Sequence, residues 1–193
     1  MEVILIRHFK TKGNLEKRYI GRTDEPLDRM AIPQRMQELK TERVIVSPMK
    51  RCRQTAEILF PGQTQTVCDS LRECDFGEFE GKNYLELSAN PLYQGWIDSG
   101  GTMPFPGGES HDEFRKRCVQ GFEHMMDQLE KDACKNAAFV VHGGTIMSIL
   151  ETFDPEHREF YHWQAANGEG FRIKIPDEAW KSGRKYFAEI EKL

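Results

Sequence analysis

The chain has 193 residues, of which 30% are charged and 38% are hydrophobic, and its net charge is −4. This composition is typical of a globular protein rather than a disordered or fibrous one, and the length predicts one domain over residues 1–193. An acidic chain is not expected to bind nucleic acid. No apolar stretch approaches the roughly 20 residues of a membrane helix, so no membrane partner is expected.

The five cysteines form no CxxC pair and are odd in number, which favours a reduced protein. The apolar run at the N-terminus ends at Arg7 and does not have the form of a signal peptide. The expected location is therefore the cytoplasm.

Short runs of apolar or alternating residues predict five strands. They are residues 3–6, 44–47, 63–67, 137–141 and 171–176. The last of these alternates, as an edge or late strand does.

Six helices are expected, and in three of them, 48–60, 109–131 and 145–153, apolar residues recur at helical spacing. The six are residues 29–40, 48–60, 82–88, 109–131, 145–153 and 178–191. Ser47 is the expected N-cap of the second helix and Pro48 its first residue. Residues 8–28 and the rest of 70–108 are expected to be loops. Because strands and helices alternate, the sequence predicts an α/β fold, a three-layer αβα sandwich with a mostly parallel central sheet.

Two of the predicted strands run directly into a histidine, His8 and His142. Ligands of open α/β sheets bind at the carboxyl ends of the strands, so these two side chains are expected to face one crevice. A single histidine there is more often a residue with local hydrogen bonds, but two at equivalent positions favour a functional site.

Two arginines accompany the histidines. Arg7 ends a buried strand, where its charge requires a carboxylate or a bound anion. Arg51 lies one turn into the helix after the second strand, where an anion is favoured and an arginine fork matches phosphate. Lys50 and Arg53 lie beside it, so position alone does not select Arg51.

Histidines and arginines in this arrangement indicate phosphate chemistry. A neutral imidazole nitrogen can attack phosphorus and form a phosphohistidine, while arginines neutralise the phosphoryl oxygens. A carboxylic acid must protonate the leaving oxygen. The chain has neither a Walker loop nor an acidic magnesium cluster, and the scheme predicts no metal ion and no cofactor.

The sequence resembles the histidine phosphatase superfamily, the phosphoglycerate-mutase-like group, through five motifs in the family's order. They are RHFKTKGN (7–14), SPMKRCRQTAEIL (47–59), LRECDFGEFEGK (71–82), PGGES (106–110) and VVHGG (140–144). The resemblance spans residues 3 to about 150 and implies the phosphoglycerate-mutase-like α/β sandwich.

Matching positions give the implied roles. The resemblance implies that His8 is the nucleophile and that Glu73 is the proton donor, which afterwards activates water. It implies that Arg7, Arg51 and His142 contact the transferring phosphoryl group.

Four further residues are expected around the phosphate or the substrate. Asn14 matches a polar residue of the loop after the first motif, and the Thr11 hydroxyl is expected to line the pocket. Gly143 belongs to the VVHGG motif. Arg22, in the family-like stretch GRTDEPL, is expected to reach the substrate, with a surface role as an equal alternative.

Several acids leave alternatives open. Glu78 and Glu80 compete with Glu73, and only motif position favours Glu73; for the other two, a solvated loop charge is the simpler interpretation. Glu109 and Ser110 match positions of substrate-side contacts, and equally suit a first-turn acid and a helix cap.

The sequence departs from the family at Phe9, where glycine is usual. Glycine gives backbone freedom near the phosphate, so Phe9 is expected to wall the pocket or bias substrate choice. The departure removes no chemical group.

The chain is short between Gly81 and Glu109, which resembles the phosphatase branch. The RHFKT opening, the GRTDEPL stretch and the chain length resemble the alpha-ribazole phosphatases in particular. The resemblance implies a metal-independent phosphomonoesterase acting on a small-molecule phosphate ester, such as alpha-ribazole 5′-phosphate, as a monomer or homodimer. The alternatives are a cofactor-dependent phosphoglycerate mutase and a non-catalytic module that binds phospholigands.

Overall fold

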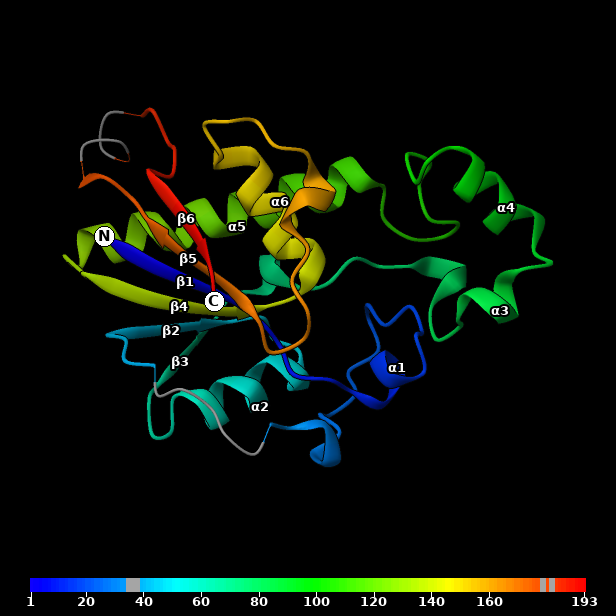
Figure 1. The fold of residues 1–193 in the computed structure, drawn as a ribbon, viewed down its shortest axis with the longest axis horizontal. Coiled ribbons are helices and arrows are strands. Elements are labelled where there is room, and N and C mark those ends of the chain that lie inside the picture. Colours follow the sequence, from blue (N-terminus) through cyan, green and yellow to red (C-terminus); the bar gives the residue numbers. More distant parts are fainter. Residues whose placement is uncertain (34–38, 178–179, 181–182) are drawn as a thin grey trace.

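A computed structural model describes residues 1–33, 39–177, 180 and 183–193 (Figure 1). The strands are β1 (Glu2–Arg7), β2 (Arg43–Val46), β3 (Gln65–Val67), β4 (Asn136–Val141), β5 (Gly170–Lys174) and β6 (Glu189–Lys192). The α-helices are α1 (Lys12–Leu15), α2 (Lys50–Leu59), α3 (Tyr84–Leu87), α4 (Pro91–Asp98), α5 (His111–Lys131) and α6 (Gly143–Phe153). The 3-10 turns among these described residues are η1 (Arg29–Ala31), η2 (Asp69–Leu71), η3 (Gly77–Phe79) and η4 (Phe160–Trp163).

The six strands form one sheet in the order β3-β2-β4-β1-β5-β6. The four strands from β3 to β1 run parallel, whereas β5 and β6 are antiparallel to their neighbours. The predicted α/β class with a mostly parallel sheet is therefore confirmed. Because β6 lies outside β5, the strand predicted at 171–176 is not at the edge of the sheet.

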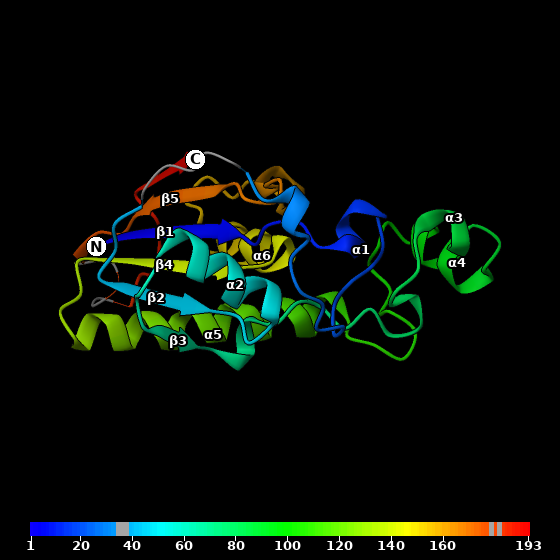
Figure 2. The same cartoon turned by 90° about the horizontal axis from the view of Figure 1, so that it is seen from below.

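Successive side chains of β1 point to opposite faces of the sheet and build two cores. Leu5 belongs to the cluster that contains Phe122 of α5 and Ile146 of α6. Ile4 belongs to a second cluster, with Ala56 of α2. Helices α5 and α6 therefore cover one face and α2 the other (Figures 1 and 2), which gives the predicted three layers.

Helices α3 and α4 lie beyond the carboxyl ends of the parallel strands, away from the sheet in both views (Figures 1 and 2). They have a small core of their own, which includes Phe79 and Tyr93 with Trp96 packed against it. The ring of Tyr19, which follows α1, lies 6.2 Å from the rings of Phe79 and Tyr93. This packing ties α4, which the sequence left as irregular, to the loop that follows β1.

The start of α2 differs from its prediction. The helix begins at Lys50 with Met49 as its N-cap, so Ser47 is not the cap and Pro48 is not the first helical residue. The Ser47 hydroxyl lies 2.7 Å from Nε2 of His142 instead. The same hydroxyl also accepts the N–H of Met49 at 3.4 Å, so Ser47 combines a local contact with one to a distant residue.

The helix predicted at 29–40 is reduced to the single 3-10 turn η1 in the part that is described. Ile32 is extended, with φ −77° and ψ 128°, as a residue before proline prefers. Residues 34–38 of the prediction lie outside the described residues.

The helix predicted at 178–191 is wrong over residues 183–191, although Trp180 is helical. Residues 183–188 are not helical, and Ile190 of β6 pairs with Ile173 of β5. Gly183 has a φ of +76°, which lies outside the helical region. Residues 178–179 and 181–182 lie outside the described residues.

Candidate active site

The carboxyl ends of the parallel strands bring the two histidines together. Arg7 pairs with Val141 across β1 and β4, so the next residues, His8 and His142, meet at one edge of the sheet. Their ring centroids lie 5.2 Å apart, and their exposed fractions are 3% and 0%.

The surroundings of His8 determine which ring nitrogen carries the proton. Nδ1 lies 2.6 Å from the carbonyl oxygen of Phe9. Because a carbonyl only accepts, Nδ1 is the donor and Nε2 keeps its lone pair in the neutral ring. Burial, and then the charge of Arg51, lower the pKa of His8 to about 3. His8 is therefore neutral near pH 7, with Nε2 free to act as a nucleophile.

Arg7 lies against the start of α6. Its Nη1 donates to the carbonyl oxygen of Ala165 at 2.8 Å. A Cβ atom on Gly143 would stand 3.3 Å from the guanidinium carbon of Arg7, so this glycine permits the close approach. Because Gly143 has no side chain, the guanidinium of Arg7 can lie against the start of α6.

Arg51 is a fully buried arginine, only 1% exposed. It donates to the carbonyl oxygens of Thr23 at 2.8 Å and Gly21 at 3.0 Å. The buried Nε atoms of Arg51 and Arg7 have no hydrogen-bond partner among the described residues. Unpartnered charged donors of this kind are suited to an anion.

His142 occupies the N-cap position of α6, although its side chain makes no capping hydrogen bond. Its Nε2 lies 2.7 Å from Oγ of Ser47 and 3.6 Å from Sγ of Cys52. Burial, and then the charge of Arg51, lower the pKa of His142. Ser47 was missed as a site residue, although its place at the end of a parallel strand was an available signal.

Glu73 packs its carboxyl group against the start of α6. Its Oε1 accepts the N–H of Cys74 at 3.0 Å, and a Cβ atom on Gly144 would stand 3.0 Å from it. Burial raises the pKa of Glu73, while the N–H of Cys74 and the charges of Arg51 and Arg7 oppose this rise. A carboxyl group with a raised pKa can act as a proton donor.

The two competing acids have different surroundings. Glu78 is exposed. Glu80 accepts the N–H of Gly21 at 3.0 Å and of Thr23 at 2.9 Å, so it is not the solvated charge that the sequence suggested. Glu80 holds the same loop whose carbonyl groups bind Arg51, and so supports the site indirectly.

Helix α1 presents Asn14 near His8. Thr11 is fully buried and caps α1: its Oγ1 accepts the N–H of Asn14, and Oδ1 of Asn14 accepts the N–H of Thr11, both at 3.2 Å. Asn167, which the sequence did not suggest, donates from Nδ2 to the carbonyl oxygen of His8 at 2.9 Å. Asn167 also lies 3.4 Å from Oδ1 of Asn14, so it links α1 to the end of β1.

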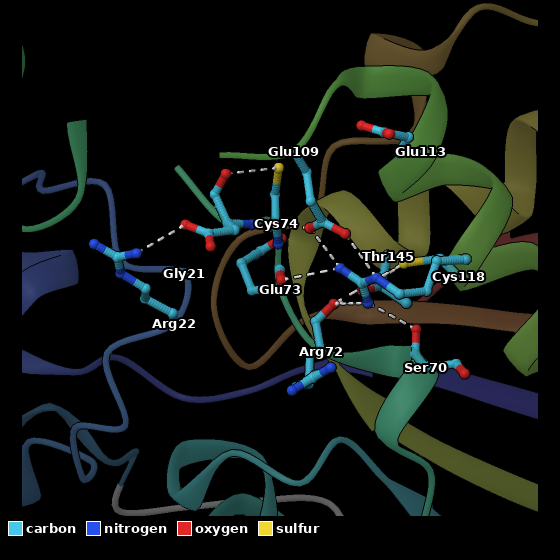
Figure 3. A network of polar contacts seen from close by, with 12 residues as sticks. Gly21, Arg22, Ser70, Arg72, Glu73, Cys74, Glu109, Glu113, Cys118 and Thr145 are labelled. Atoms are coloured by element: carbon cyan, nitrogen blue, oxygen red, sulfur yellow. Dashed lines mark hydrogen bonds and ion pairs between the residues drawn. The ribbon is translucent and has the colours of Figure 1, made fainter. Parts of the chain in front are cut away.

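Two cavities meet at Glu73. The first has a volume of about 290 Å³ and is lined by Gly21, Arg22, Met49, Arg72, Glu73, Asp75, Glu109 and Arg117. The second has a volume of about 620 Å³, and its lining includes Arg7, Glu73, Gly143, Gly144, Gln164, Glu169 and Lys192. Arg22 is exposed, and its guanidinium lies 3.7 Å from the carboxylate of Asp75 (Figure 3).

Phe9 is 3% exposed and is not among the residues that line either cavity. A Cβ atom on Gly168 would stand 2.9 Å from its ring, and Gly168 has a φ of +84°. The N–H of Phe9 donates to Oγ1 of Thr55 at 3.0 Å. Phe9 therefore packs against Gly168, in space that a side chain at that position would fill, and does not line either cavity.

Within residues 1–33, 39–177, 180 and 183–193, no helix has the length and apolar character needed to cross a bilayer. The same residues contain no group of three or more His, Cys, Asp or Glu side chains arranged to hold a metal ion.

Comparison with known proteins identifies the family. Residues 3–185 match the histidine phosphatase superfamily (branch 1). Phosphoglycerate mutase-like protein 4 of Arabidopsis thaliana is 29% identical over 171 residues, which cover 82% of this chain and 73% of that protein. A broad-specificity phosphatase of Saccharomyces cerevisiae is 27% identical over 173 residues, with the same coverage.

The fold has relatives among solved structures. The alpha-ribazole phosphatase of Shigella flexneri superposes with a TM-score of 0.80 and 20% identity, over 97% of this chain and 93% of that one. The chain belongs to the histidine phosphatase superfamily, as the motifs predicted, and has the phosphoglycerate-mutase-like fold.

Proposed function

We propose that the protein is a phosphomonoesterase that transfers the phosphoryl group through a phosphohistidine on His8 and needs no metal ion. The state of His8 is the observation that carries this proposal. Its Nδ1 proton is bound by the carbonyl of Phe9, and the ring stays neutral down to a pKa of about 3. Nε2 thus keeps a nucleophilic lone pair beside Arg7 and Arg51.

In the first step, Nε2 of His8 attacks phosphorus, and the bond from phosphorus to the leaving oxygen breaks. Glu73, whose pKa is raised by burial, gives its proton to that oxygen. In the second step, the Glu73 carboxylate takes a proton from water, the water oxygen attacks phosphorus, and the phosphorus–nitrogen bond breaks. Inorganic phosphate and the alcohol are the products.

Positive charge around the phosphoryl group stabilises the transition state. The buried Nε atoms of Arg7 and Arg51 can donate to its oxygens. His142 stands at the N-cap position of α6, and the N-terminus of a helix favours an anion. These groups supply the charge that a metal ion supplies in other phosphoryl-transfer sites.

The substrate we propose is a small phosphate ester whose leaving group enters the 290 Å³ cavity beside Glu73. The lining carries both signs of charge together with Met49, which suits a polar group with an apolar part. Alpha-ribazole 5′-phosphate is one such ester, although a structural likeness at 20% identity bears on the fold alone. A mutase must keep water from its phosphohistidine, and two cavities that border Glu73 favour hydrolysis instead.

The test is phosphate release in the presence of a chelator from alpha-ribazole 5′-phosphate, nucleoside monophosphates, sugar phosphates and 3-phosphoglycerate. We expect release from at least one ester and an acid-labile phosphoryl label on the protein that His8→Ala lacks. A label on a residue other than His8, or isomerisation of 3-phosphoglycerate in place of hydrolysis, would overturn the proposal.

A further inference from the structure

Glu73 lies on a stretch of chain without regular backbone hydrogen bonding. Residues 72–76 lie between η2 and η3 and belong to neither a helix nor a strand. A proton donor has to stay within about 0.5 Å of its productive position. Other groups must therefore fix this stretch.

Arg117 of α5 binds the stretch on the side that precedes Glu73. Its Nη1 donates to the carbonyl oxygens of Ser70 at 2.9 Å and Arg72 at 3.0 Å, and its Nη2 donates to that of Glu73 at 3.3 Å. Ser70, Arg72 and Glu73, the three residues whose carbonyl oxygens accept these bonds, lie close together in Figure 3. One guanidinium group thus satisfies three backbone acceptors.

Glu109, just before α5, binds both Arg117 and the side that follows Glu73. Its carboxylate accepts from Nε and Nη2 of Arg117 at 2.8 and 2.7 Å. The same carboxylate accepts the N–H of Asp75 at 2.9 Å, and the N–H of Glu109 donates to the carbonyl oxygen of Asp75 at 2.9 Å. The backbone is therefore held on both sides of Glu73.

The ion pair is well formed and partly shielded from water. The side chains of Arg117 and Glu109 are 22% and 24% exposed, and the Arg117 guanidinium lies 5.4 Å from the centre of the Phe114 ring. Two parallel hydrogen bonds in such surroundings are stronger and more directional than an exposed pair. The charge of Arg117 also opposes the rise in the pKa of Glu73.

We infer that Arg117 and Glu109 are positioning residues that hold the carboxyl group of Glu73 where it protonates the leaving oxygen. This role rests on the proposed function, in which Glu73 is the proton donor. It differs from a role in folding alone because it depends on how much proton transfer the leaving group needs.

The test compares Arg117→Lys with the wild type on an alkyl phosphate and on p-nitrophenyl phosphate. An alkoxide leaves only with a proton, whereas p-nitrophenolate leaves readily without one. We expect kcat/KM to fall about 30-fold for the alkyl ester and less than about 3-fold for the aryl ester. Arg115→Lys is the matched control, because Arg115 lies on the same helix and pairs with Glu151 at 2.7 Å. It should change neither rate.

A pH profile supplies a second readout. Arg117→Gln removes a charge that lowers the pKa of Glu73, so the alkaline decline of kcat/KM should move to higher pH; Arg117→Lys should leave it in place. If Arg117→Lys does not fold, Glu109→Gln carries the same comparison of the two esters.

Equal losses on both esters, or no loss on either, would overturn the positioning role. Trapping of the phosphorylated enzyme separates this failure from a failure of the proposed function. If wild-type His8 is phosphorylated while Arg117→Lys loses both activities equally, only the positioning role is rejected. If wild-type enzyme forms no phosphohistidine, the proposed function itself is rejected.

Discussion

The candidate site consists of two halves that are held in different ways. The strand-end half (Arg7, His8 and His142) follows from the pairing of β1 with β4, which aligns the two strand ends. The loop half (Glu73 and residues 20–23) belongs to no helix or strand. Backbone ladders and two apolar cores fix the first half, and single charged side chains fix the second.

The two halves should respond differently to the loss of one side chain. A ladder of backbone hydrogen bonds survives the loss of one polar side chain, whereas a loop held by one carboxylate or one guanidinium does not. Glu80 binds two amides of the 20–23 loop, and Arg117 binds three carbonyl groups around Glu73. Substitutions in the strand-end half should remove chemistry and leave the geometry, and substitutions of the side chains that hold the loop half should disturb the geometry.

The largest expected effect is in the strand-end half. His8→Ala should lower kcat/KM at least about 10³-fold, because it removes the nucleophile. The fold should persist, since Leu5 and Ile6 still fill the two cores. Phosphate release and urea unfolding at pH 7.5 measure the two quantities. His124→Ala, at an exposed residue of α5, is the control and should be fully active; more than a few per cent activity in His8→Ala would contradict the assignment.

A smaller loss of kcat/KM is expected when Glu73, the proposed proton donor in the loop half, is replaced. Glu73→Gln should lower kcat/KM about 10²-fold on alkyl phosphates. Wild-type activity requires protonated Glu73, so it should decline as the pH rises through the raised pKa of this group, and the variant should lack that decline. An alkaline decline that is unchanged in Glu73→Gln would assign it to another group. Phosphorylation by an aryl phosphate should survive and shows that His8 remains competent.

Buried His8 of the strand-end half should make the folded protein less stable at acidic pH. Unfolded His8 takes up a proton below about 6.5, whereas the folded ring does so only near 3. As the pH falls from 6.5 toward 3, the unfolded state binds more protons, so stability falls, by about 2 kcal/mol at pH 5 from His8 alone. Between pH 7.5 and 5, the free energy of unfolding should therefore fall less in His8→Ala than in the wild type. Urea unfolding at pH 7.5 and at pH 5 measures this fall in the wild type and in His8→Ala. An equal fall in the two proteins would refute the prediction.

The smallest effect concerns the support of the loop half. Glu80→Gln should lower kcat/KM about tenfold, because the loop that binds Arg51 loses a charged acceptor for two amides. Steady-state kinetics measure the loss. Glu78→Gln, at an exposed acid two residues away, is the matched control and should retain full activity. A loss of equal size in both variants would show that only the local charge matters.

The strand-end half was largely accessible from the sequence. The runs before His8 and His142 are local patterns, and parallel strands bring their carboxyl ends to the same edge. The motif order added Glu73, which no local pattern distinguished from Glu78 and Glu80.

The rest depends on contacts between residues far apart in the chain. Ser47 reaches His142 across 95 positions, and Arg117 reaches Glu73 across 44, so neither partner is visible in a local window. The helix expected at 178–191 failed for a related reason. Residues 189–192 pair with β5 and form a strand, and this pairing partner is distant in the sequence.

The cysteines offer a way to measure local opening of the two halves of the site separately. All five thiols are free and buried. Cys52 lies 3.6 Å from Nε2 of His142, and Cys74 directly follows Glu73. Burial raises the pKa of both thiols, so an alkylating reagent should attack each only when its surroundings open. The alkylation rate of Cys52 thus reports how often the strand-end half opens locally, and that of Cys74 reports the same for the loop half.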